Sequence, residues 1–363
     1  MRSSPYTMKN ISSLELMFLV MSNIIGIGIL STPNTISKTT LFSDGWVVLL
    51  LSGCIAATLG WICTKLSAYF PQKSFFEYTS SLVSKSVACI LTAIAICIFI
   101  CMAGYETRAI SVVVSIYLTD GLSLQIIAFL FLLPITYGLC GSRIALLRLN
   151  IWFLLITLSV LILLFLLNIN LIDITRLFPI LQTPPIDYIT SMRHTAFTFS
   201  GFEIVLFYTS LISKPKNAPR YVVRGVFLVI AIYIIIYLMC ISLFSQNVTQ
   251  VLTYPVIELG KGLEIDEFLE RFDILFFFTW IITLFTTTVM YIDISLIALS
   301  SIFKKIKKQT FVFILMPIIY FIAFIPQGMG NLNQFGYILS LVNFSFMLII
   351  PAVLLLITCI KKS

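Results

Sequence analysis

The sequence predicts an all-α integral membrane protein that forms a single transmembrane domain over residues 1–363. Three observations carry this prediction. The chain is 60% hydrophobic and only 10% charged, and its mean hydropathy is +1.07, which is far too apolar for a soluble domain. Apolar stretches of membrane-spanning length recur along the chain, separated by short polar segments. Two of these stretches are interrupted midway by glycine, which is a poor helix former.

Ten transmembrane helices are expected, and the apolar stretches give their bounds as 12–37, 45–69, 86–117, 124–141, 149–168, 187–213, 220–245, 268–302, 310–326 and 334–358. A further apolar stretch, Phe75 to Leu82, is too short to cross the hydrocarbon core and is predicted to lie at the membrane interface. Lys and Arg are enriched in cytoplasmic loops. Of the 23 such residues, seventeen fall in one set of loops and ends, five fall in the other and Arg108 lies within a span. Both termini are therefore predicted to be cytoplasmic.

The first span contains the first interruption. Ser12 and Glu15 have the spacing of a capping box, so a helix should begin there. The helix should fail at Gly26-Ile27-Gly28, about halfway along, and leave backbone groups unpaired at membrane depth. Such a break is tolerated only where it faces protein, water or a ligand. The alternative is that the two glycines let a neighbouring helix approach closely.

The second half of the chain repeats this pattern. The sixth span is interrupted midway at Ser200-Gly201, and the third span of each half, 86–117 and 268–302, is unusually long. Five spans followed by five must give halves of opposite orientation, because five is odd. The sequence therefore predicts a five-plus-five inverted repeat, roughly 11–169 and 185–359, with broken first and sixth helices. A ligand site is expected at the two breaks, as in transporters built this way.

The chemistry of that site follows from the helix ends. Free amides around Ile27 to Ile29 and the positive end of a half-helix suit a carboxylate. Free carbonyls near Phe199 and Ser200 suit an ammonium. With Phe197 and Tyr105 as further lining, the expected ligand is an α-amino acid with an apolar side chain. The candidate ligand-binding residues are Gly26, Ile27, Gly28, Tyr105, Phe199, Ser200, Gly201, Glu203 and Thr287.

Ionisable groups within the spans are costly and each needs a reason. Glu203 follows the second break, where it either caps orphan amides or binds a ligand ammonium, a cation or a proton. Glu106 is a weaker site candidate, and Arg108, two residues on, points to a nearly opposite face and is predicted to tie helices together. Asp293 is expected to have a structural role or to act as a gate. Thr287 either binds a ligand or sodium or bonds back to its own backbone.

Several classes of function are disfavoured. His194 is the only histidine, which argues against histidine-based catalysis, bis-histidine haem and histidine-rich metal sites. The chain has no G-x-S-x-G, H-E-x-x-H or matched aspartate pair, so no enzyme, cofactor or metal is predicted. The eight cysteines lack metal or disulfide spacing, and the basic residues form no patch for nucleic acid. The acidic segment Glu258 to Asp273 is either a solvated lead-in to a helix or a docking surface.

At five places the sequence resembles the spore germination permease family, the B subunits of nutrient germinant receptors within the amino acid–polyamine–organocation superfamily. These are Ile25 to Pro33 (IGIGILSTP), GSRIALLRLN at 141–150, LFPIL at 177–181, FSGFEI at 199–204 and FLERFDILFFFTW at 268–280. The chain differs from the family at two points. Thr286 follows Phe285 where a basic residue is common, and Arg143 stands near the usual place of an acidic one.

The resemblance implies ten helices in a five-plus-five inverted repeat, small amino-acid-like nutrients as ligands, and partner A and C subunits in the inner membrane of a dormant spore. The expected function is therefore a nutrient-sensing subunit that triggers germination. The alternative is an ion-coupled amino acid transporter with net flux.

Overall fold

The computed structural model of the protein describes residues 11–26, 28–119, 121–195, 198–212, 214–261 and 272–362. Within these ranges the chain is almost entirely helical, and an isolated parallel bridge joins Ile11 to Ile212. Six described helices are long and apolar enough to cross a membrane: α3 (Gly45–Ala68), α5 (Lys85–Tyr117), α7 (Arg143–Asn168), α10 (Ala218–Thr249), α12 (Phe272–Ile302) and α14 (Met329–Lys362). The all-α membrane prediction is confirmed at this level.

The first span is broken as expected. Helix α1 (Ser13–Ile24) and helix α2 (Gly28–Ser37) meet at an angle of 55°, and together they are apolar enough to count as a seventh span. The capping box that starts α1 is confirmed, because the Glu15 amide donates to Ser12 Oγ at 3.1 Å and the Ser12 amide to Glu15 Oε2 at 2.6 Å. Ile27 lies outside the described residues.

The sixth span is interrupted earlier and over a longer stretch than predicted. Helix α8 (Pro185–His194) ends well before Ser200-Gly201, and the chain resumes in short helical turns: η3 (Phe202–Ile204), α9 (Val205–Tyr208) and η4 (Thr209–Leu211). The hydroxyls of Thr195 and Thr198 bond to Ser52 and Thr32 on other helices, at 2.9 and 2.7 Å. These contacts hold the segment that follows α8 against other helices, and the local sequence does not predict them.

The two remaining predicted spans correspond to α6 (Leu124–Cys140) and α13 (Lys308–Ala323), which have 17 and 16 residues. A transmembrane helix typically needs about 20 residues, so both are short for a full span. Helix length thus supports six spans, or seven with the bent pair, and the count of ten stays a prediction. The short stretch Phe75–Leu82 forms helix α4, which a second capping box begins at Ser74.

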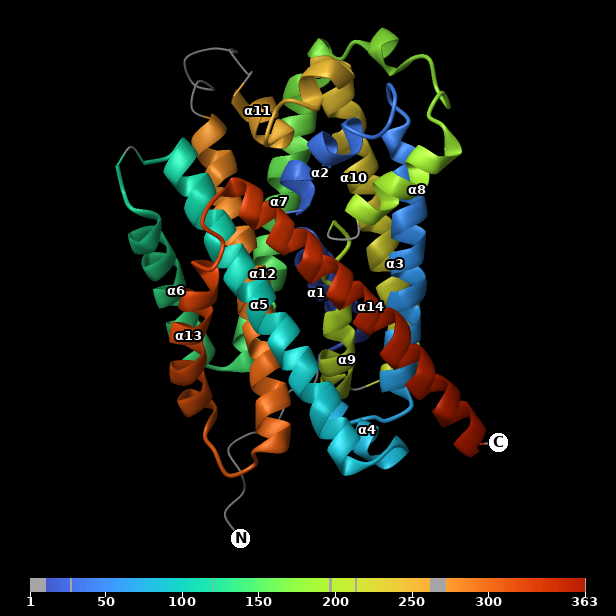
Figure 1. The fold of residues 1–363 in the computed structure, drawn as a ribbon, viewed down its shortest axis with the longest axis vertical. Coiled ribbons are helices and arrows are strands. Elements are labelled where there is room, and N and C mark those ends of the chain that lie inside the picture. The colour runs from blue at the N-terminus through green and yellow to red at the C-terminus, as the bar shows by residue number, and fades with distance from the viewer. Residues whose placement is uncertain are drawn as a thin grey trace.

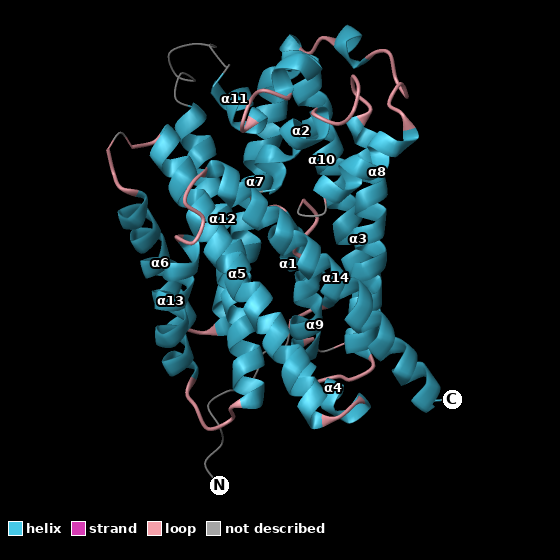
Figure 2. Cartoon of the chain, in the orientation of Figure 1, coloured by secondary structure: helices cyan, strands magenta, loops and turns pink. Residues whose placement is uncertain are grey.

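Helices in equivalent positions of the two predicted halves pack against each other (Figure 1). Helix α3 packs on α10, α5 on α12, and α6 on α13. The end of α14 and helix α4 lie at one end of the bundle, whereas α2, α8 and the short helix α11 (Pro255–Lys261) lie at the other. Figure 2 shows that loops run between the helices at both ends of the bundle. This arrangement is compatible with the predicted membrane orientation, in which the end of α14 faces the cytoplasm.

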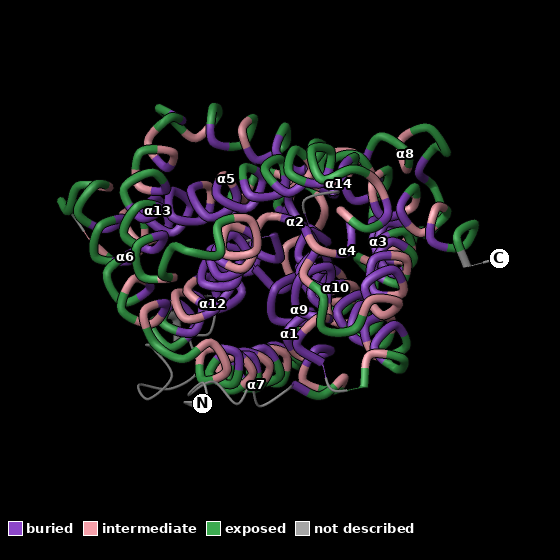
Figure 3. The backbone as a smooth tube through the Cα atoms, turned by 90° about the horizontal axis from the view of Figure 1, so that it is seen from below, coloured by how far each residue is buried: buried purple, intermediate pink, exposed green. Residues whose placement is uncertain are grey.

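Burial follows the arrangement expected of a membrane protein. Viewed along the bundle, buried residues fill the centre around α1 and α9, and exposed residues form the rim (Figure 3). Many exposed side chains are large and apolar, including Phe129, Trp152, Phe313 and Phe321. An apolar rim of this kind suits contact with lipid.

Asp44, the N-cap residue of α3, fastens the loop that precedes α8. Its carboxylate is buried and accepts backbone N–H groups from Gln182 at 2.7 Å and Thr183 at 2.8 Å. Next to it, the Ser43 hydroxyl donates to the Leu177 carbonyl at 2.6 Å. The LFPIL motif at 177–181 is therefore part of a structural clasp at the α2–α8 end of the bundle.

Candidate functional site

The two helix breaks touch each other at Gly201. This residue has φ +128, a conformation that glycine adopts freely. A Cβ atom there would lie 2.6 Å from the carbonyl carbon and oxygen of Asn23, near the end of α1. The Asn23 side-chain amide also donates to the Gly201 carbonyl at 3.1 Å. The absence of a side chain at Gly201 therefore lets its backbone lie directly against the backbone at the end of α1.

Gly28, the first residue of α2, is the second point of close approach. A Cβ atom on it would lie 3.1 Å from Thr198 Cα. The Thr32 hydroxyl bonds the Gly28 carbonyl at 2.6 Å and pairs with the Thr198 hydroxyl at 2.7 Å. At the end of α1, Tyr233 donates its hydroxyl to the Ile24 carbonyl at 2.8 Å. Part of the backbone exposed by the breaks is thus satisfied within the protein.

Gly26 lies against a buried carboxylate. Glu106, on α5, accepts hydroxyl hydrogen bonds at Oε2 from Thr287 at 2.9 Å and Thr288 at 2.8 Å, both on α12. A Cβ atom on Gly26 would lie 3.4 Å from Glu106 Oε1 and 3.6 Å from Thr287 Cγ2. The structure therefore joins two candidate residues, Gly26 and Thr287, through Glu106. The Thr287 hydroxyl also bonds back to the Leu284 carbonyl at 3.1 Å.

Glu203 is fully buried on the other side of the breaks. Its Oε2 accepts the Gly201 amide at 2.7 Å, and its Oε1 accepts the side-chain amide of Asn343, on α14, at 3.0 Å. This geometry is that of a cap on the turn that begins η3. Among the described residues, neither Glu203 nor Glu106 forms an ion pair.

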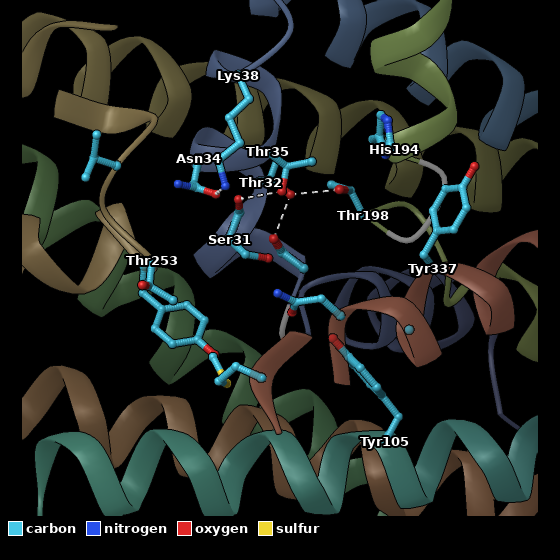
Figure 4. A pocket seen from close by; sticks show the side chains of 16 residues that line it. Ser31, Thr32, Asn34, Thr35, Lys38, Tyr105, His194, Thr198, Thr253 and Tyr337 are labelled. Carbon is cyan, nitrogen blue, oxygen red and sulfur yellow. Dashed lines mark hydrogen bonds between the residues drawn. The ribbon is translucent and has the colours of Figure 1, made fainter. Parts of the chain in front are cut away.

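A cavity of about 410 Å³ opens at the α2–α8 end of the bundle (Figure 4). Its inner end is lined by Gly28, Thr198, Tyr105 and Gly336. One wall is formed by the polar face of α2, with hydroxyl and amide groups, and by the ammonium of Lys38 directly after it. The residues of this wall are Ser31, Thr32, Asn34, Thr35 and Lys38. The facing residues include three that are aromatic or apolar, namely Tyr254, Met329 and Tyr337.

The predicted site residues fall into two groups. Gly28 and Tyr105 line the cavity. The others that the structure describes are packed beside or beneath it: Gly26, Phe199, Ser200, Gly201, Glu203 and Thr287. The ring of Phe199 packs against Tyr233 with centroids 5.4 Å apart. Ile27 and Phe197 lie outside the described residues. The ligand-binding role of all these residues remains a prediction.

Sequence reasoning missed the polar wall and Asn343. An asparagine within an apolar helix is itself a signal, since polar groups at membrane depth need partners. Asn34 lies on α2 and Lys38 directly follows that helix, and no sequence pattern marks either as a site residue. Their shared wall depends on how α2 is turned toward α14, which no local pattern reveals.

Asp293 anchors a charged cluster at the opposite end of the bundle. Arg143 Nε lies 2.9 and 2.8 Å from its two carboxylate oxygens, the Tyr208 hydroxyl 3.2 Å from Oδ2 and Lys308 Nζ 3.9 Å from Oδ1. These contacts join α7, α9, α12 and α13. Arg143 thus has a buried carboxylate partner. Arg108 packs over the Phe324 ring at 5.1 Å, which is the interhelical contact predicted for it.

Comparison with known proteins gives a consistent result. The family model described as "Spore germination protein" matches residues 10–332. Spore germination protein GerLB of Bacillus cereus is 44% identical over 100% of this chain and 98% of its own length. Spore germination protein A2 of Bacillus subtilis (strain 168) is 26% identical over 95% of this chain and 94% of its own.

Solved structures with a similar fold include transporters. MhsT in complex with L-phenylalanine superposes with a TM-score of 0.67 at 13% identity, over 94% of this chain and 87% of that one. Mhp1, a nucleobase-cation-symport-1 family transporter in a closed conformation with bromovinylhydantoin bound, gives a TM-score of 0.72 at 13% identity, over 92% and 76%. At this level of identity the likeness concerns the fold alone.

Proposed function

The chain belongs to the family of spore germination proteins, and on this premise we propose that it is a nutrient germinant-receptor subunit. In this proposal it binds a small amino acid or similar germinant in the cavity above Gly28 and triggers spore germination. It acts with A and C receptor subunits in the inner membrane of the spore. Ten transmembrane helices in an inverted repeat, with both termini cytoplasmic, complete the proposal.

The observation that carries the proposal is the meeting of both helix breaks at the inner end of an open cavity. Gly28 and Thr198 come from the two breaks and both line it. A volume of about 410 Å³ lies in the range typical of small-molecule sites. MhsT, which shares the fold, was solved with an amino acid bound.

The ligand groups can be assigned from local charge. The α2 amides at Gly28 and beyond favour a carboxylate. Glu106, which lies behind Gly26 and has no cationic partner among the described side chains, favours an ammonium. Its neighbour Tyr105 lines the same inner end of the cavity. A zwitterion bound there would have its carboxylate at the α2 amides and its ammonium toward Glu106.

An ion-coupled transporter with net flux is the second candidate. Two observations favour it: the solved neighbours with this fold include transporters, and two buried carboxylates flank the breaks without ion pairs among the described residues. A carboxylate in such a place is a suitable carrier for a proton or cation. The receptor proposal takes precedence because the relatives named above are germination proteins.

The proposal is tested by adding bulk at the break. Gly28→Leu should abolish the germination response to nutrient while the protein stays at normal abundance, because the new side chain meets the Thr198 backbone and fills the inner end of the cavity. Gly138→Leu is the matched control, since a Cβ atom there also has a neighbour at 3.1 Å, but that neighbour is the flexible side chain of Leu146 away from the cavity. A normal dose–response in Gly28→Leu spores would contradict the proposal.

A further inference from the structure

The cavity is longer than a small amino acid. It is lined both by Gly28, the first residue of α2, and by Lys38, which follows the last residue of that helix, Ser37. At 1.5 Å per residue, ten residues span about 15 Å. A small ligand held at Gly28 therefore cannot also reach Lys38, and the outer part of the cavity is available for a separate contact.

Lys38 is held at the outer end by an anchored amide. Its Nζ donates to Asn34 Oδ1 at 2.8 Å. Asn34 Nδ2 in turn donates to backbone carbonyls that follow α10, at 2.9 Å to Gln250 and 2.6 Å to Leu252. Figure 4 shows Lys38 beside Asn34 at one end of the cavity, with Tyr105 near the other.

The ammonium of Lys38 has no countercharge nearby in the described part of the chain. No described carboxylate lies within 4.0 Å of it. Its bond to Asn34 uses one of three N–H donors. The two buried carboxylates Glu106 and Glu203 belong to the region of the breaks. Among the described residues, the cavity thus has the positive charge of Lys38 at its outer end and the carboxylate of Glu106 beneath its inner end.

We propose that Lys38 and Asn34 form an outer subsite that receives the carboxylate of an incoming amino acid before the ligand reaches Gly28. This inference rests on the proposed function and adds a selection for ligands that carry a free carboxylate. Ser31 and Thr35 lie between the two ends of the cavity on the same helix and offer hydroxyls along the way. A ligand whose carboxylate is converted to an amide keeps only its positive charge and is repelled at the mouth.

The test compares association rates of an amino acid and its carboxamide with purified protein in lipid nanodiscs. The amino acid is the one of the twenty proteinogenic L-amino acids that binds wild type most tightly, and it is compared with its own carboxamide. For wild type the acid should associate faster than the amide. Lys38→Gln should reduce that ratio about two- to fivefold, the range of an exposed charge pair. Lys38→Arg should keep it, and so should Lys216→Gln, which removes the same charge from the other end of the bundle.

A second measurement does not depend on the folding of any variant. Raising the ionic strength should lower the wild-type ratio of the acid's association rate to the amide's, as Lys38→Gln does, because exposed charges are screened by salt. An unchanged ratio in Lys38→Gln that still binds the acid, or a wild-type ratio insensitive to salt, would overturn the outer subsite and leave the proposed function standing. Absence of saturable binding to wild type would overturn the proposed function, and this inference with it.

Discussion

Glu106 and Glu203 are both buried carboxylates beside the helix breaks, but their partners differ. Glu203 is bonded at both oxygens by amide donors, from Gly201 and Asn343. The hydrogen-bond partners of Glu106 are two hydroxyls, from Thr287 and Thr288, and both donate to the same oxygen, Oε2. Its other oxygen faces Gly26 at the break. The contacts therefore favour a capping role for Glu203 and a ligand role for Glu106.

Glu106→Gln should weaken the nutrient response strongly. The glutamine oxygen can still accept both threonine hydroxyls, so the packing is kept, but the charge offered to an ammonium is lost. A charge-assisted hydrogen bond is worth about 1.5 to 3 kcal/mol. The nutrient concentration for half-maximal germination should therefore rise about ten- to hundredfold, measured on spores with receptor abundance checked by immunoblot. A rise below about threefold at normal abundance would contradict the ligand role.

Glu203→Gln should be mild by the same measurement. The glutamine oxygen can accept the Gly201 amide, and its NH₂ group can donate to Asn343 Oδ1, which has no hydrogen-bond partner, if the Asn343 amide turns over. Only the charge–dipole contribution of about 0.3 to 1 kcal/mol is lost. Glu203→Ala should instead lower receptor abundance, because buried donors left unpaired cost about 1 to 3 kcal/mol each. A tenfold shift in Glu203→Gln at normal abundance would restore a ligand role.

At the scale of single elements, local sequence predicted where the first helix begins and where it breaks. The Ser12–Glu15 box and the paired glycines are local signals, and the structure has both. The end of α8 at His194 was not predicted, because the sequence gives no glycine or proline stop signal between His194 and Gly201. The polar wall of the cavity was not predicted either, because it depends on how α2 is rotated against the helices around it.

The clasp at Asp44 gives a pH-dependent contribution to stability outside the membrane spans. Burial alone would raise the pKa of Asp44, but N–H groups of Thr183, Leu181 and Gln182 and the Thr183 hydroxyl together lower it below the usual value. A carboxylate with a depressed folded-state pKa stabilises the protein above its unfolded-state pKa, about 4, and loses that effect as the pH falls through the folded-state pKa. The melting temperature of wild type should therefore decline below about pH 4.

Asp44→Asn should flatten that decline and lower the melting temperature at neutral pH. The lost interactions involve a charged acceptor and are worth about 1.5 to 3 kcal/mol. Thermal unfolding of purified protein in detergent across pH provides the measurement. Asp187→Asn, on neighbouring α8, should keep the wild-type pH dependence. An Asp44→Asn profile parallel to wild type at all pH values would show that the clasp does not titrate with folding.

At the scale of the whole molecule, the packing of α3 on α10, α5 on α12 and α6 on α13 pairs elements that the sequence assigns to equivalent positions of two halves. Composition and charge were enough to predict a polytopic helical bundle, because the membrane restricts the choice of structure. The contacts that make the site were not predictable in the same way. Gly26, Glu106 and Thr287 are far apart in the chain and meet only after α5 and α12 pack.

The central claim is that the protein binds a small amino acid at the meeting point of its two broken helices. Equilibrium binding and uptake of the twenty radiolabelled proteinogenic L-amino acids, measured with purified protein in liposomes, test it most directly. We predict saturable binding of at least one of them to wild type, loss of that binding in Gly28→Leu, its retention in Gly138→Leu, and no net uptake above protein-free liposomes. Wild-type protein that is folded but binds none of the twenty would contradict the claim, and uptake that Gly28→Leu abolishes would identify a transporter instead.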